Sequence, residues 1–102
     1  VLRDGNEVQV IPVERISHFT AQGDFVEINT VNNSYLKYER LNHLEEMLDK
    51  QIFIRVHRSH ILNLEFLHKI ETSESGSRNA RITTNASIPI SKSGYKLLMQ
   101  VI

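Results

Sequence analysis

The sequence predicts a mostly β domain, with one amphipathic helix in the middle of the chain and a short helix at its end. Three observations lead to this prediction. Short segments of β character fill the first forty residues, the apolar spacing becomes helical between 39 and 50, and β character returns from residue 52. The chain has 102 residues, 40% of them hydrophobic. This length is enough for one modest core, so we expect a single domain over 1–102.

The first strands are short and are separated by residues that favour turns. Turns are expected at 21–24, where Gly23 is free to take a positive φ, and at 32–34. The segments on either side of the second turn should form a hairpin, because the first alternates and the second is a short return strand. Pro12 indicates an edge or a bulge. The expected strands are 7–13, 14–21, 24–31 and 35–38.

The middle of the chain has the spacing of an amphipathic helix. Leu41, Leu44 and Leu48 recur at helical intervals, Met47 lies beside them, and charged residues fill the opposite side. This pattern predicts a helix of about three turns over about 40–50. Its apolar stripe should pack on the sheet.

Strands and a terminal helix are expected after residue 51. Ser91 is a suitable N-cap for a helix over 91–102, whereas Gly94 counts against that helix. A polar turn is expected at 73–78. The apolar residues at helical spacing near the end are Tyr95, Leu98, Met99 and Ile102. The expected extended segments are 52–57, 66–72, 79–84 and 86–91.

The charges are separated along the chain although they sum to zero. Residues 1–50 hold five basic and nine acidic side chains, and residues 51–102 hold seven basic and three acidic ones. A neutral protein with one basic face can still bind a polyanion.

A candidate catalytic site and a candidate metal site both lack further residues that such sites require. Ser93 and Lys96 have the S-x-x-K spacing of acylating serine enzymes, but the S-D-N and K-T-G motifs are absent. His57, His60 and His68 stand near one another without a cysteine, and the first two should point to opposite faces of a strand. We therefore expect neither an enzyme nor a bound metal or cofactor.

The sequence also lacks a recognisable membrane-spanning segment or signal peptide. The sequence has no run of about 18 apolar residues, and its first residues do not resemble a signal peptide. The absence of cysteine fits a cytoplasmic protein. Because the chain begins with Val1 rather than Met, we expect a domain taken from the end of a larger protein.

The run "IFIRVHRSHILN", residues 52–63, carries most of the candidate binding groups. It combines strand residues with a polar group whose arginines can hold a phosphate with two bonds or read guanine in the major groove. The alternative is that these side chains form hydrogen bonds in turns and salt bridges within the protein. The donors in this run are Arg55, His57, Arg58, Ser59 and Asn63.

Two further polar segments suggest a reading surface of three loops on a β scaffold. One is the turn tip at 22–24, and the other is the start of the last helix, "SKSGYK" at 91–96. Sequence-specific DNA binding is one interpretation. The other is a β-rich protein or peptide interaction module, in which a basic loop meets an acidic partner along an edge strand.

Four motifs in series resemble the LytTR-type DNA-binding domain of bacterial response regulators. The segment 53–63, "FIRVHRSHILN", matches the family pattern F-x-R-x-H-R-S followed by an apolar pair and Asn. The others are "ISHFTAQGDFVEI" at 16–28, "LEEML" at 44–48 and "IPISK" at 88–92. The match runs in the family's order over about residues 8–98.

The resemblance implies an elongated domain of small antiparallel β-sheets that inserts loops into successive major grooves of bent duplex DNA. Arg58 would be the main base reader, forking onto guanine. The family also implies an upstream phosphorylatable receiver domain and a homodimer on paired sites. Arg40 departs from the hydroxyl residue common at its helix cap. The implied DNA-binding residues are Arg58, Lys92, His57, Ser59, Gln22, Asp24, Lys96 and Asn63.

Overall fold

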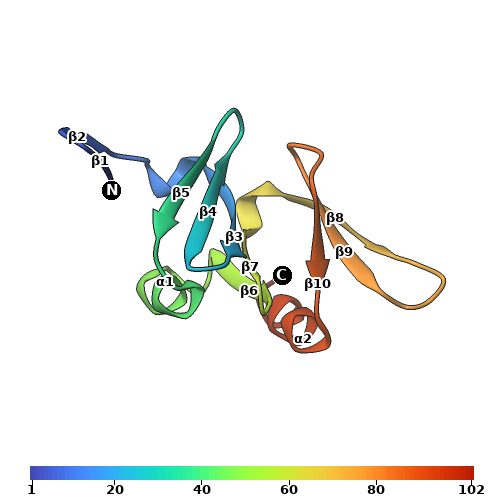
Figure 1. Cartoon of the computed structure of the whole chain (residues 1–102). Helices are drawn as coiled ribbons and strands as arrows, with labels where there is room; N and C mark the ends of the chain where they lie inside the picture. Colours follow the sequence, from blue (N-terminus) through green and yellow to red (C-terminus); the bar gives the residue numbers. More distant parts are fainter.

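The computed structural model describes residues 1–102, apart from the side chain of Asp4. The molecule is elongated, with principal extents of 49 × 24 × 24 Å. Its chain forms three antiparallel sheets and two α-helices (Figure 1). This confirms the mostly β fold of small antiparallel sheets.

The central sheet consists of β3 (Ile16–Gln22), β4 (Phe25–Thr30), β5 (Ser34–Tyr38), β6 (Phe53–His57) and β7 (His60–Asn63), in the order β5-β4-β3-β7-β6. Gly23 has a φ of 59° in the turn between β3 and β4, which confirms the predicted turn. Strands β4 and β5 form the expected hairpin. Strands β6 and β7 form a second hairpin, whose turn is Arg58–Ser59.

Each face of the central sheet carries its own core, because side chains alternate between the faces of a strand. One core joins the sheet to helix α1 (Leu41–Met47), and the other joins it to helix α2 (Lys92–Val101) and to a second sheet. Buried side chains of the first core include Phe19, Val26, Leu41 and Ile61. Those of the second core include Val56, Leu62, Ile82 and Leu98.

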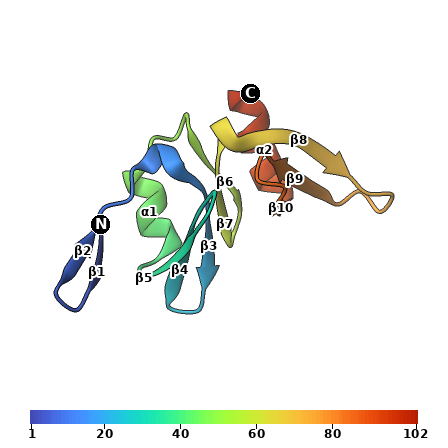
Figure 2. The ribbon, with the colours of Figure 1, turned by 90° about the horizontal axis from the view of Figure 1, so that it is seen from above.

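The second sheet consists of β8 (Leu67–Thr72), β9 (Arg78–Ile82) and β10 (Ser87–Ile90), in the order β10-β9-β8. Two 3-10 turns, η1 (Val13–Arg15) and η2 (Leu64–Phe66), lead into β3 and β8. At the N-terminus, β1 (Leu2–Asp4) and β2 (Glu7–Gln9) form a small hairpin that projects from the rest of the molecule (Figure 2).

Several element boundaries differ from the sequence predictions. The strand expected at 7–13 ends at Gln9, and β1 has no counterpart in the predictions. The helix expected over 40–50 is shorter, and Arg40 and Leu48 are its caps. Its stripe packs on the sheet as expected through three leucines, but Met47 is 68% exposed.

Helix α2 confirms the predicted terminal helix, and its glycine has a packing role. Ser91 is the N-cap, and its Oγ accepts a hydrogen bond from the Gly94 amide at 3.0 Å. Gly94 is buried directly against the backbone of Val56 on β6. A Cβ at position 94 would lie 2.7 Å from Val56 Cα and still closer to its carbonyl group. Glycine therefore lets α2 approach β6, which outweighs its weak helix propensity.

Candidate nucleic-acid interface

Two backbone hydrogen bonds bring the three predicted polar segments together along one side of the molecule. The Ala21 amide, next to the β3–β4 turn, donates to the Ser59 carbonyl in the β6–β7 turn at 2.9 Å. The Ser91 amide, at the start of α2, donates to the Val56 carbonyl of β6 at 2.8 Å. The β6–β7 turn therefore lies between the other two segments. We call these three segments the contact edge: 22–24, 57–59 and 91–96 (lower part of Figure 1).

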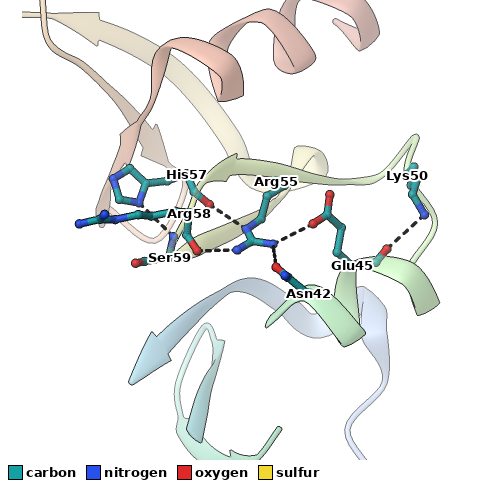
Figure 3. A network of polar contacts seen from close by, with 7 residues as sticks. All are labelled: Asn42, Glu45, Lys50, Arg55, His57, Arg58 and Ser59. Atoms are coloured by element: carbon teal, nitrogen blue, oxygen red, sulfur yellow. Dashed lines mark hydrogen bonds and ion pairs between the residues drawn. The ribbon is translucent and has the colours of Figure 1, made fainter. Parts of the chain in front are cut away.

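Arg55 attaches the β6–β7 turn to helix α1 (Figure 3). Its Nε donates to the His57 carbonyl at 2.9 Å, and its Nη2 donates to the Arg58 carbonyl. Its Nη1 donates to Asn42 Oδ1 at 2.7 Å and to Glu45 Oε1 at 2.8 Å. The guanidinium charge is therefore used inside the protein, and Arg55 positions the turn instead of serving as a free donor.

The charged side chains of the contact edge are open to solvent. Arg58, Lys92 and Lys96 are exposed, and within the described part of the chain no carboxylate lies within ion-pair distance of them. In Figure 3 the Arg58 side chain extends away from the network that holds its backbone. A hollow of about 270 Å³ between the β6–β7 turn and α2 is lined by Arg58 and Ser93, among others. Cations in this arrangement are available to an anionic partner.

The β3–β4 turn places Gln22 and Asp24 on the surface beside these cations. Both side chains are exposed. Gln22 Nε2 donates to Glu27 Oε2 at 3.3 Å, so its side chain is directed toward β4. The carboxylate of Asp24 is the one acidic group that the sequence predicted for the contact set.

Asn63 lies elsewhere, and the expectation that it faces DNA does not match its position. It is 1% exposed. Its Nδ2 donates to the Ile16 carbonyl at 2.9 Å, and its Oδ1 accepts from the Glu65 amide at 2.9 Å. Both ends of the amide are satisfied by the backbone, so Asn63 braces β3 and η2 and takes no part in the contact edge.

The two histidines of the second hairpin lie on the same side. His57 and His60 are cross-strand partners with ring centres 5.2 Å apart, so the expectation of opposite faces is wrong. A two-residue turn separates them and reverses the chain. The alternation of side chains along one continuous strand therefore does not apply to this pair. The Ser59 amide donates to His57 Nδ1 at 3.1 Å. His57 and Ser59 are half-buried, so they shape the turn that presents Arg58.

Burial keeps the inner histidines of this face neutral. Burial, together with the neighbouring His57 and His18, lowers the pKa of His60 from 6.5 to about 4. Burial also lowers the pKa of His18, although Glu27 opposes that effect. His60 Nδ1 lies 3.0 Å from Thr20 Oγ1, which joins β7 to β3 by a side-chain hydrogen bond.

Across the described residues, no three His, Asp or Glu side chains gather closely enough to hold a metal ion. Neither α-helix has the length and apolar character needed to cross a membrane.

The model of the LytTr DNA-binding domain family matches residues 6–102. The chain belongs to the LytTr DNA-binding domain family. The family pattern that the sequence resembles therefore applies to almost the whole chain, including all three segments of the contact edge. Its members bind DNA, and the contact edge offers basic side chains that have no acidic partner among the described residues.

Known regulators share this domain at low identity. A heme-containing CO-sensing transcriptional regulator, RcoM 1 of Paraburkholderia xenovorans (strain LB400), is 30% identical over 98 residues, covering 95% of this chain and 37% of the relative. The sensory transduction protein LytT of Bacillus subtilis (strain 168) is 26% identical over 98 residues, covering 96% of this chain and 41% of the relative. The chain thus spans about two fifths of these relatives.

A solved structure confirms the fold. The LytTr DNA-binding domain of a Bacillus cereus response regulator aligns with a TM-score of 0.85 and 20% sequence identity. The alignment covers 98% of this chain and 92% of the other. The arrangement of small sheets around two helices is therefore that of the family.

Proposed function

We propose that this chain binds duplex DNA in a sequence-specific manner, as the DNA-binding part of a bacterial transcriptional regulator. The supporting observation is the contact edge itself. Three segments far apart in the sequence meet there through two backbone hydrogen bonds, and Arg58, Lys92 and Lys96 have no acidic partner in the described structure. Backbone hydrogen bonds and the bonds from Arg55 hold the turns behind them, so the side chains are presented from fixed backbone positions.

The order of the segments along the edge suggests a role for each. The β3–β4 turn and the start of α2 flank the β6–β7 turn, so they are suited to enter successive major grooves of a bent duplex. Arg58 lies between them and reads base edges at the centre of the site. Lys92 makes a base or phosphate contact, and Lys96 adds charge one helical turn further on.

Affinity measurements with modified guanine bases can show which groove Arg58 enters. The sequence-based expectation was a fork onto guanine N7 and O6 in the major groove, whereas the central position points to the minor groove between the outer segments. Substituting 7-deazaguanine removes the N7 acceptor of the major groove, and inosine removes the N2 amino group of the minor groove. With the minor-groove placement, inosine changes the Arg58-dependent affinity and 7-deazaguanine does not. The reverse result restores the major-groove fork.

The wider biological setting follows from the same proposal. The relatives are longer regulators, which fits an upstream domain such as a phosphorylatable receiver in the full-length protein. Paired binding sites would then recruit a homodimer, in the cytoplasm where bacterial DNA lies.

Selection of the chain against a random duplex library at moderate salt tests the proposal. An enriched motif that binds far better than a scrambled duplex of equal length supports sequence-specific binding. Without enrichment, binding that only fades as salt rises leaves generic polyanion attraction. That result would reject the proposal and favour the rival, a β-rich module whose basic loop meets an acidic protein or peptide.

A further inference from the structure

We propose that Arg40, with Tyr38 and Asn42, forms a second contact surface for DNA, which takes a backbone phosphate next to the groove entered by the β3–β4 turn. This inference rests on the proposed function and adds a sequence-independent contact to it. Arg40 is the residue at the start of α1 that departs from the usual helix cap.

The helix gives up stability at Arg40. Arg40 is the N-cap of α1, and its side chain makes no capping hydrogen bond. A Ser, Thr, Asp or Asn at an N-cap would satisfy one of the free amides there. A positive side chain at the N-terminus of a helix also opposes the helix dipole. Departures from local stability rules of this kind are expected where a residue serves function.

The position of Arg40 explains what that function is. A hollow of about 560 Å³ separates the β5–α1 junction from the β3–β4 turn, and Arg40, Tyr38 and Asn42 line it together with Gly23 and Asp24. The hollow is thus continuous with the contact edge. A turn that enters a major groove has a sugar–phosphate backbone on either side. On the side away from the β6–β7 turn, that backbone would lie over this hollow.

The groups that line the hollow leave suitable donors for a phosphate. Arg40 is exposed, and none of the carboxylates described in the structure lies within ion-pair distance of its guanidinium. Asn42 Oδ1 is engaged by Arg55, which leaves the Nδ2 amide hydrogens for another acceptor. Tyr38 is 77% exposed and is supported at its edge by Phe25, with ring centres 5.7 Å apart.

Two carboxylates also line the hollow, those of Glu39 and Asp24. Glu39 Oε1 accepts from the Arg40 amide at 3.0 Å and lies 2.9 Å from His43 Nδ1. These hydrogen bonds hold the pKa of the Glu39 carboxyl below its usual range, so the group is charged, but it is engaged by the helix start and not by the Arg40 guanidinium. Asp24 is the remaining carboxylate. A cation at position 40 would offset its repulsion of a phosphate.

The test uses Arg40→Ser and Arg40→Ala in this chain, with the selected duplex and a scrambled duplex of equal length as probes. Each variant should weaken binding to both duplexes by the same factor, about two- to fivefold. Each should also make the fall of log K with log salt less steep by about 0.9, the value for one lost phosphate contact. Arg40→Ser should at the same time raise the melting temperature by a few degrees, because it restores a capping hydroxyl.

A gain in thermal stability together with a loss of affinity excludes misfolding as the cause. The matched control is Arg15→Ala, since Arg15 is exposed and precedes β3, at the opposite end of that strand from the β3–β4 turn. It should leave the affinity and the salt slope unchanged. Equal affinity and slope for the Arg40 variants and the wild type would overturn this inference alone. So would a loss confined to the selected duplex, which is the behaviour of a base reader.

These outcomes are distinct from a failure of the proposed function. If the wild-type chain does not discriminate between the two duplexes, the sequence-specific proposal fails first. If it discriminates through Arg58 while the Arg40 variants behave as the wild type, only the phosphate contact is wrong.

Discussion

Replacement of Gly94 by alanine should destabilise the protein, although alanine is the better helix former. The new methyl group would meet the backbone of Val56, with Val56 Cα only 2.7 Å away, and backbone has little freedom to move aside. Helix α2 would have to lift from β6, which stretches the 2.8 Å bond from the Ser91 amide to Val56 and loosens Leu98, now 0% exposed.

The expected magnitude follows from two opposing effects. Overpacking against a rigid neighbour costs about 1–3 kcal/mol, and occasionally more, with a further loss where the cap bond and the Leu98 contacts are disturbed. The gain in helix propensity from Gly to Ala is about 1 kcal/mol. Because the clash is with backbone atoms, we take the upper end of the overpacking range, about 3 kcal/mol, so the net loss is about 2 kcal/mol. This corresponds to a fall in melting temperature of about 10 °C for a chain of this size.

Urea and thermal unfolding, followed by circular dichroism, measure the effect. Gly76→Ala is the control, because Gly76 has a φ of 90° but a Cβ there meets nothing within 4 Å. It should show the cost of backbone strain without a steric clash, about 1–2 kcal/mol. A Gly94→Ala protein as stable as the wild type would refute the close approach of α2 to β6.

Three further predictions concern the scaffold behind the contact edge. Asn63→Leu should lower the free energy of unfolding by about 2–4 kcal/mol in urea titrations, because it leaves the buried Ile16 carbonyl and the partly buried Glu65 amide without partners. A change below 1 kcal/mol would contradict that role. Arg55→Lys should keep the fold by circular dichroism but reduce discrimination between selected and scrambled duplexes, since one ammonium cannot reproduce four separate contacts; unchanged discrimination would show that the turn holds itself. For His60, whose pKa is lowered to about 4, the unfolded state binds more protons between about pH 6.5 and pH 4. Stability should therefore fall as the pH drops through that window, and His60→Gln should reduce this dependence in urea titrations at a series of pH values, whereas an unchanged dependence would assign it to other groups.

The sequence predicted most of the strands and both helices because their patterns are local. Alternation and turn residues located the β3–β4–β5 segment, and helical spacing located α1. The N-terminal hairpin was missed because its strands have only three residues each. Strand β6 was predicted, but β7 and its pairing with β6 were missed, because Arg58 and Ser59 are not among the residues that mark two-residue turns.

Which polar residues face outward could not be read from sequence in the same way. Arg55 and Arg58 are both arginines at the end of one strand, yet the first is fixed by α1 and the second is free. That difference depends on Asn42 and Glu45, which lie ten or more residues away. Asn63 likewise is decided by a partner 47 residues distant. Only the packing of the sheets reveals such assignments.

The role of Arg58 is the central claim, and one measurement tests it most directly. Fluorescence anisotropy gives the affinity of the wild type and of Arg58→Ala for the selected and the scrambled duplex at one salt concentration. We expect Arg58→Ala to lose about 1–3 kcal/mol of binding on the selected duplex and much less on the scrambled one, so that discrimination collapses. Equal losses on both duplexes would make Arg58 a phosphate contact and would contradict the account of base reading at the centre of the contact edge.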